Sequence, residues 1–154
     1  MVTYVYIYLV CIISPLLGLA EPITLLAASS SDLNWLLIVI AVSGGQLTCF
    51  FILYQFGAQL RDRIPWLQRK LEKVDLTKYE SAKPKITTLA GLFGLPPATA
   101  LALAGPIYQP RRAQFILILA VTRFVRFLPI AAAPAVFMEY FDPSILPDWA
   151  RNLF

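Results

Sequence analysis

The sequence predicts an all-α integral membrane protein with two re-entrant hairpins of opposite orientation, two full transmembrane helices and a surface amphipathic helix. Composition is the first reason: 58% of the 154 residues are hydrophobic and 14% are charged, whereas about a quarter of the residues in a soluble domain are charged. Distribution is the second reason, because residues 1–60 contain no Lys or Arg, and their acidic residues are Glu21 and Asp32. A soluble core cannot hide such a segment, but a bilayer can.

The chain is expected to form a single membrane domain, residues 1–154. Its first segment, residues 1–31, is apolar but is interrupted by a proline, a glycine and the dipeptide Glu21-Pro22. We therefore expect a broken, re-entrant segment here. A complete span by residues 2–20 is the alternative.

Residues 34–56 predict the first transmembrane helix. They hold no charge over 23 positions, and about 20 apolar residues cross the hydrocarbon core of a bilayer. Gly44 and Gly45 lie near the middle of this segment, where the lack of side chains lets a neighbouring helix approach closely. Gln46 and Thr48 are expected to hydrogen-bond to such a helix, with a polar path as the alternative.

Residues 58–85 predict a basic cytoplasmic loop that contains the amphipathic helix. Eight of the 13 basic residues lie in this loop, together with four acidic residues. The interspersed acidic residues and the flanking apolar segments argue against nucleic-acid binding. The predicted helix lies on the membrane surface, and a helix packed on another part of the protein is the alternative. Apolar residues recur at spacings of three and four: Leu60, Ile64, Leu67, Leu71 and Val74.

The remaining segments repeat this order. Residues 86–110 predict a second re-entrant segment, because a straight span would leave backbone groups unpaired at Pro96-Pro97. Residues 113–138 predict the second transmembrane helix, and residues 139–154 form a mixed tail. The residues assigned to hairpin turns are Pro22, Gly94, Pro96, Pro97 and Gly105.

A weak internal repeat accompanies this order. Leu17-Gly18-Leu19 resembles Phe93-Gly94-Leu95, which lies 76 residues later. Because one span separates the two broken segments, the hairpins are expected to enter the membrane from opposite faces. Inverted repeats of this kind are typical of secondary transporters.

Three charged residues within apolar segments form the candidate substrate or proton pathway: Glu21, Arg123 and Arg126. Arg123 lies 11 residues after Arg112, which places it about 16 Å along a helix, near the middle of a bilayer. A charge at that depth costs at least about 2.5–3.5 kcal/mol, so we predict that Glu21 pairs with Arg123 or Arg126. The alternatives are that Glu21 caps a short helix, that Arg123 clamps hairpin carbonyls and that Arg126 extends to the membrane surface.

Short motifs in both halves of the chain are similar to one known membrane core. The first half has an acidic residue before a short helix (Glu21), a glycine at a helix contact (Gly45) and an aromatic-Gly end to its span (residues 54–57). The second half has Ala104-Gly105, Pro110, Arg111-Arg112 and Phe115, followed by the Arg-aromatic residues 122–127. In these features the chain resembles the DedA superfamily, whose core is also called the VTT or SNARE-associated-like domain, and in particular its YqaA-like branch.

The resemblance implies two facing re-entrant hairpins with additional spans, and transport or lipid translocation across a bilayer. The chain departs from the family pattern at three positions. Gly91 and Pro97 stand where arginines are usual, and Phe50 replaces a common Asp. These departures argue against proton-coupled drug or ion export, but they leave the membrane architecture intact.

The predicted function is a small membrane transporter or lipid translocator that moves an anionic or amphipathic substrate through paired hairpins. The alternative is a non-catalytic membrane subunit that supports assembly or envelope integrity. No enzymatic role, cofactor or metal site is expected, because the chain has no His and its two cysteines lie in apolar runs. The expected partners are membrane lipids and a homo-oligomer or second membrane subunit, without nucleic acid, in the bacterial inner (cytoplasmic) membrane.

Overall fold

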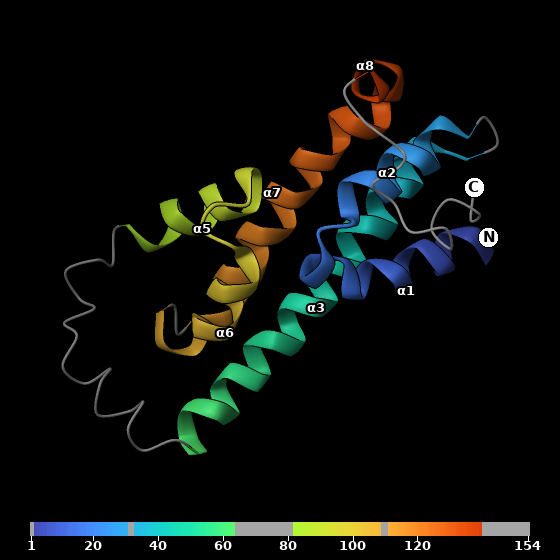
Figure 1. The fold of residues 1–154 in the computed structure, drawn as a ribbon. Helices are drawn as coiled ribbons and strands as arrows, with labels where there is room; N and C mark the ends of the chain where they lie inside the picture. Colours follow the sequence, from blue (N-terminus) through green and yellow to red (C-terminus); the bar gives the residue numbers. More distant parts are fainter. Residues whose placement is uncertain (1, 31–32, 64–81, 109–110, 140–154) are drawn as a thin grey trace. The chain divides into compact units, whose positions relative to one another are not determined.

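Every regular element in the part of the chain that the structure describes is an α-helix (Figure 1). The structure, a computed structural model, describes residues 2–30, 33–63, 82–108 and 111–139. This confirms the all-α prediction. The helices are α1 (Val2–Leu17), α2 (Ala20–Ser29), α3 (Trp35–Arg63), α5 (Lys83–Phe93), α6 (Ala98–Tyr108), α7 (Arg112–Ala132) and α8 (Pro134–Met138).

Two of these helices are long and apolar enough to cross a membrane, namely α7 and the Trp35–Gly57 part of α3. α3 begins after Asn34, whose Oδ1 accepts a hydrogen bond from the Leu36 N–H at 2.9 Å and so caps the helix. α3 continues beyond the predicted span to Arg63. The start of the predicted surface helix is therefore continuous with α3, and the rest of it, within residues 64–81, lies outside the described residues.

The second predicted span is shorter than expected. α7 ends at Ala132, whereas residues up to 138 were assigned to the span. The reason is Pro134, which begins the separate helix α8, because a proline disfavours helical conformation in the residue before it. Ala133 accordingly has a φ of −134°. Of the predicted tail, residues 140–154 lie outside the described residues.

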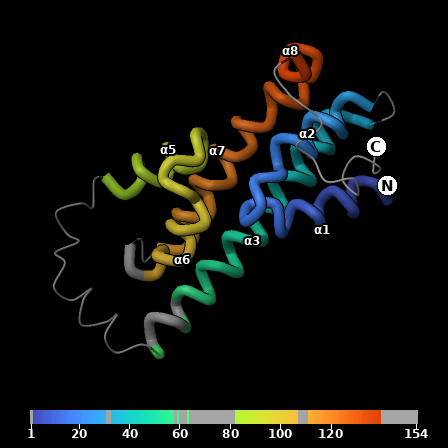
Figure 2. The backbone as a smooth tube through the Cα atoms, viewed as in Figure 1, coloured from blue at the N-terminus to red at the C-terminus, as the bar shows by residue number. Residues whose placement is uncertain are grey.

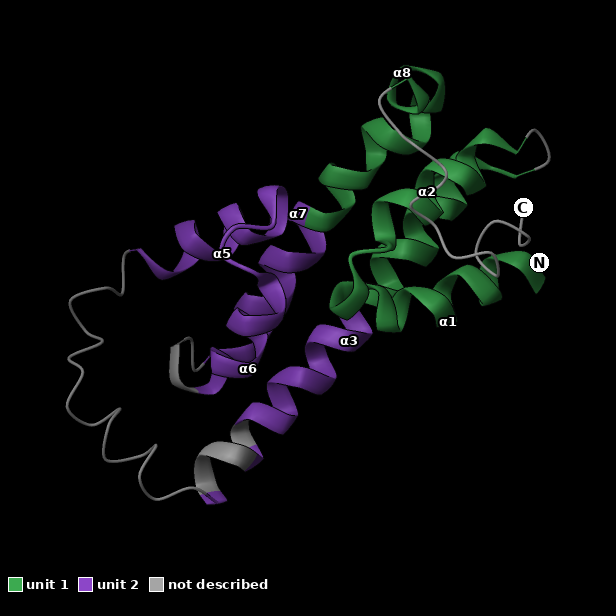
Figure 3. Ribbon diagram, in the orientation of Figure 1, with its two compact units in different colours: residues 1–46, 123–154 green, residues 47–122 purple. Residues whose placement is uncertain are grey.

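The chain forms two compact units, and each long helix contributes to both (Figure 3). Unit 1 comprises residues 1–46 and 123–154, and unit 2 comprises residues 47–122. Each unit therefore holds one pair of shorter helices, the first part of the long helix that follows them and the last part of the other long helix, and unit 1 also holds α8.

Gly18 makes the turn between α1 and α2, and Figure 2 traces the backbone through this connection. The φ of Gly18, 70°, lies in the left-handed region that glycine adopts readily. Its N–H donates to the Ser14 carbonyl at 2.8 Å. Pro15, within α1, has no N–H to offer the Cys11 carbonyl, and the Ser14 hydroxyl donates to that carbonyl instead, at 3.0 Å.

Pro22 was assigned to this turn, and that assignment is wrong. α2 begins at Ala20, so Pro22 lies within its first helical turn. A proline is tolerated there because its fixed φ suits a helix and because the first N–H groups of a helix have no intrahelical partner. The chain reversal needs a positive φ, which Gly18 supplies and a proline cannot adopt.

The turn between α5 and α6 follows the prediction. Gly94 ends α5 with a φ of 77°, and its N–H donates to the Ala90 carbonyl at 3.1 Å. Pro96 and Pro97 follow in the connection to α6. Gly18 and Gly94 thus make the same left-handed turn 76 residues apart, as the weak sequence repeat indicated.

Gly105, which was also assigned to a turn, lies inside α6. A Cβ at this position would overlap ring atoms of Tyr54 on α3. The glycine therefore allows α6 to approach α3 within unit 2, and it does not serve a chain reversal. The Tyr54 ring lies 5.6 Å from that of Phe115, centroid to centroid, in the same core.

Each unit has its own apolar core. In unit 1, buried side chains from α1, α2, α3 and α7 pack together, and α2 also contacts α8. A Cβ added at Gly45 of α3 would lie 2.8 Å from Cys11 Cβ, so the prediction that a neighbouring helix approaches this glycine is confirmed, with α1 as that helix. The core of unit 2 consists of Phe50, Tyr54, Ala90, Ala98, Ala102, Phe115 and Leu119.

Candidate functional site

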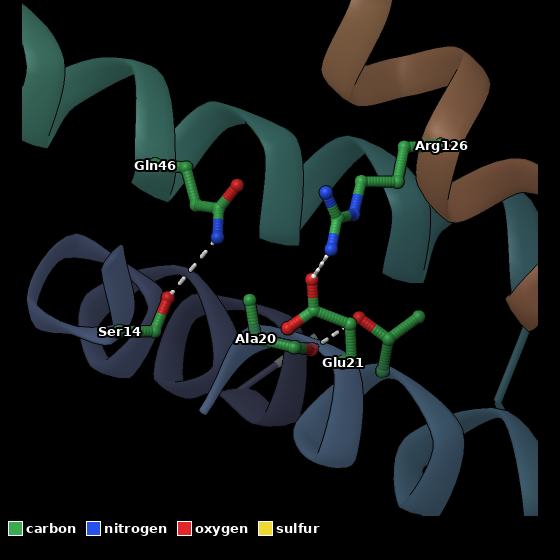
Figure 4. A network of polar contacts seen from close by, with 6 residues as sticks. Ser14, Ala20, Glu21, Gln46 and Arg126 are labelled. Carbon is green, nitrogen blue, oxygen red and sulfur yellow. Dashed lines mark hydrogen bonds and ion pairs between the residues drawn. The ribbon is translucent and has the colours of Figure 1, made fainter. Parts of the chain in front are cut away.

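Glu21 and Arg126 form an ion pair between α2 and α7 within unit 1 (Figure 4). Arg126 Nη2 donates to Glu21 Oε1 at 2.5 Å. The Arg126 side chain is 23% exposed and that of Glu21 is 36% exposed, so the pair is neither sealed in the core nor fully solvated. The predicted pairing of Glu21 with one of two arginines is confirmed, and Arg126 is the partner.

Local structure explains how Glu21 comes to face α7. The turn at Gly18 makes Ala20 the first residue of α2 and puts Glu21 in its first turn. A carboxylate is favourable there, because the N-terminal end of a helix carries partial positive charge. The alternative that Glu21 caps the helix is wrong, since Leu19 occupies the N-cap position and no side-chain cap bond forms.

Arg123 lies one turn before Arg126 on α7 and is 7% exposed. Glu21 and Arg126 are both close enough to Arg123 to act on it electrostatically. The three charged residues of the predicted pathway are thus gathered in one region of unit 1. The alternative that Arg126 extends to the membrane surface does not hold here, because its guanidinium contacts Glu21. A role of these residues in moving a substrate or a proton stays a prediction.

A second polar contact joins α1 to α3 in the same unit. Gln46 Nε2 donates to Ser14 Oγ at 3.5 Å, and both side chains are buried. This confirms the prediction that Gln46 hydrogen-bonds to a neighbouring helix. Two further buried polar residues of unit 1, Ser14 and Ser43, were not identified from the sequence. Two sequence features could have indicated them: Ser14 precedes a proline, and Ser43 lies one helical turn before Gln46.

The equivalent positions in unit 2 are apolar. The 76-residue offset of the internal repeat relates Glu21 to Pro97 and Arg126 to Phe50. Phe50 is fully buried in the apolar core of unit 2. At these related positions, the charged pair therefore occurs in unit 1 alone.

Comparison of the chain with models of known families, with curated proteins and with solved structures gave no match. The resemblance to the DedA superfamily stays a prediction from the motifs. Within residues 2–30, 33–63, 82–108 and 111–139, no three His, Cys, Asp or Glu side chains gather in a way that could hold a metal ion. Cys11 and Cys49 are both buried free thiols.

Proposed function

We propose that the chain is a multi-pass protein of the bacterial inner membrane that moves an anionic or amphipathic substrate across the bilayer, as its resemblance to the DedA superfamily implies. The observation that carries the proposal is the Glu21–Arg126 ion pair. It connects a broken helical segment to a helix that is long and apolar enough to span a membrane. Ionisable residues in such segments are rare, and they mark substrate or ion pathways in many membrane proteins.

Outward apolar faces on α1 and α7 support insertion in a bilayer. On both helices, exposed apolar side chains recur every three or four positions, which makes a continuous stripe. Monomeric soluble proteins rarely expose large apolar patches, whereas lipid chains solvate them. The residues are Val2, Val5, Leu9, Ile13 and Leu16 on α1, and Leu117, Val121, Val125 and Leu128 on α7.

Helix length supports re-entrant hairpins. α5 and α6 have 11 residues each and α2 has 10. At a rise of about 1.5 Å per residue, helices of this size cover about 16 Å, which is about half of the 30 Å hydrocarbon core. A pair such as α5–α6 is therefore long enough to reach mid-membrane and return. Its irregular turn at residues 94–97 then needs protein or a cavity around it.

The ion pair suggests how a substrate is held. A guanidinium binds carboxylate or phosphate oxygens with two parallel hydrogen bonds. In this structure the Arg126 guanidinium binds the Glu21 carboxylate. Because the pair is partly exposed, an anionic substrate group can replace this carboxylate. In this mechanism Glu21 balances the charge of Arg126 whenever substrate is absent.

Purified protein in liposomes is expected to accelerate the transbilayer movement of NBD-labelled phosphatidylglycerol. Dithionite quenching of probe in the outer leaflet measures the rate, and protein-free liposomes are the control. Release of trapped carboxyfluorescein tests a soluble anion in parallel. Rates equal to those of protein-free liposomes in both assays would contradict the proposed transport.

A non-catalytic membrane subunit is the second candidate. The observation that favours it is the short contact between Arg126 and Glu21, which could clamp α2 to α7 without any substrate. The flux assays separate the two candidates. Absence of flux, together with loss of a native complex on blue-native gels in the Arg126→Ala variant, would favour the subunit.

The basic segments are expected to lie in the cytoplasm and the C-terminal tail on the opposite side. Residues 58–85 and Arg111-Arg112 hold ten of the 13 basic residues, and such residues are retained on the cytoplasmic side. Single cysteines at Lys73 and Asn152, in a background with Cys11 and Cys49 replaced by alanine, should react with an impermeant maleimide from opposite sides. Labelling of both from the same side would defeat this topology.

A further inference from the structure

Two buried polar atoms lie on one face of α3 in unit 1. Ser43 Oγ and Gln46 Oε1 have no hydrogen-bond partner among the residues that the structure describes. Ser43 is 4% exposed and Gln46 is 2% exposed, so bulk water does not reach them. They are three residues apart in a helix, which brings their side chains to neighbouring positions on the same face.

The orientation of the Gln46 amide follows from its neighbour on α1. Ser14 Oγ donates its hydrogen to the Cys11 carbonyl at 3.0 Å. Toward Gln46 it can therefore only accept, and it accepts from Nε2 at 3.5 Å. Gln46 Oε1 consequently points away from Ser14, as Figure 4 shows.

We propose that Ser43 and Gln46 form a binding site for an internal water molecule in unit 1. Buried polar groups in proteins are almost always hydrogen-bonded, and internal water serves those that lack a protein partner. Water can donate a hydrogen bond to Gln46 Oε1. It can also accept a hydrogen bond from Ser43 Oγ or donate one to it. Two neutral oxygens suit water better than a hard cation, which takes about six to eight oxygen ligands.

The site lies where α1 crosses α3. Gly45, between the two residues, is the position at which a Cβ would collide with α1. The water therefore lies at a helix crossing and stabilises it. Gly45 lets the two helices approach closely there, and the hydrogen bond between Gln46 and Ser14 connects them. This inference concerns unit 1 alone and holds whether or not the protein transports a substrate.

Ser43→Ala is the primary test, because Ser43 Oγ makes no hydrogen bond to a described residue that the substitution would remove. If the water is bound, this variant should lower the apparent Tm by a few degrees. If the site is dry, removing an unpartnered hydroxyl should leave the Tm unchanged or raise it. The matched control is Thr24→Val, since the Thr24 hydroxyl is also buried but already donates to the Ala20 carbonyl of its own helix.

Gln46→Met is the second test variant. Methionine has nearly the same side-chain length as glutamine but has no amide group. The double variant Ser43→Ala with Gln46→Met should lower the apparent Tm by less than the sum of the two single decreases, because the two residues bind the same water molecule. In ¹⁵N-glutamine-labelled protein in micelles, the Gln46 amide protons should show a cross-peak to water that weakens in Ser43→Ala. A Tm that does not fall in Ser43→Ala, strict additivity, or the lack of a water cross-peak would each overturn the site.

Discussion

Replacing Arg126 by alanine is expected to destabilise the protein and to abolish movement of the anionic lipid probe. The substitution leaves the partly exposed Glu21 carboxylate without its ion-pair partner. Breaking a fully buried pair costs about 3–5 kcal/mol, and the partial exposure of both side chains reduces this to about 2 kcal/mol. Transport should be lost because the proposed anion-binding group is gone.

A double-mutant cycle isolates the pair. Glu21→Ala and Arg126→Ala should each destabilise more than expected for a surface charge, whereas the double variant should be more stable than the sum of the two losses predicts. We expect a coupling energy of about 1–2 kcal/mol, measured by reversible unfolding in mixed micelles. Arg111→Ala, at an exposed arginine, is the matched control.

Arg126→Lys separates stability from transport. Lysine keeps the positive charge for Glu21 but loses the planar, two-pronged geometry of the guanidinium. Stability close to that of the wild type with a reduced transport rate would support anion binding by Arg126. No coupling in the cycle, combined with wild-type transport in both Arg126 variants, would show that the pair is neither a clamp nor a substrate site.

The features that could be predicted from the sequence follow from the chemistry of single residues, such as the backbone conformations open to glycine or the cost of burying a charge. A helix that must reverse direction needs a residue with positive φ, so Gly18 and Gly94 mark turns in the structure as they do in the sequence. An isolated charge in an apolar segment needs a partner. The composition of residues 1–60 leaves few partners for an arginine, which is why Glu21 could be named.

The features that sequence could not predict depend on contacts between distant segments. Gly105 looks like a turn residue because it precedes Pro106, but its role is set by Tyr54, which lies 51 residues earlier in the chain. Arg123 and Arg126 lie one turn apart, so only the packing of α7 on its neighbours decides which of them meets Glu21. The cluster of Ser14, Ser43 and Gln46 likewise arises only when α1 crosses α3.

Gly45→Ala is expected to weaken the crossing of α1 and α3 through a single added methyl group. That group would collide with the Tyr8 carbonyl oxygen and would lie 2.8 Å from Cys11 Cβ. The first of these is backbone, so α1 itself has to move. Overpacking of this kind costs about 1–3 kcal/mol, which outweighs the gain of about 1 kcal/mol in helix propensity from glycine to alanine.

Gly44→Ala is the matched control, because it makes the same chemical change one position earlier. A Cβ at Gly44 would lie 3.4 Å from a ring carbon of Tyr8, a side chain that can shift slightly. This variant should therefore be as stable as the wild type or slightly more stable. Thermal unfolding followed by tryptophan fluorescence compares the two, and equal apparent Tm values for Gly45→Ala and Gly44→Ala would mean that α1 does not depend on Gly45 for its place against α3.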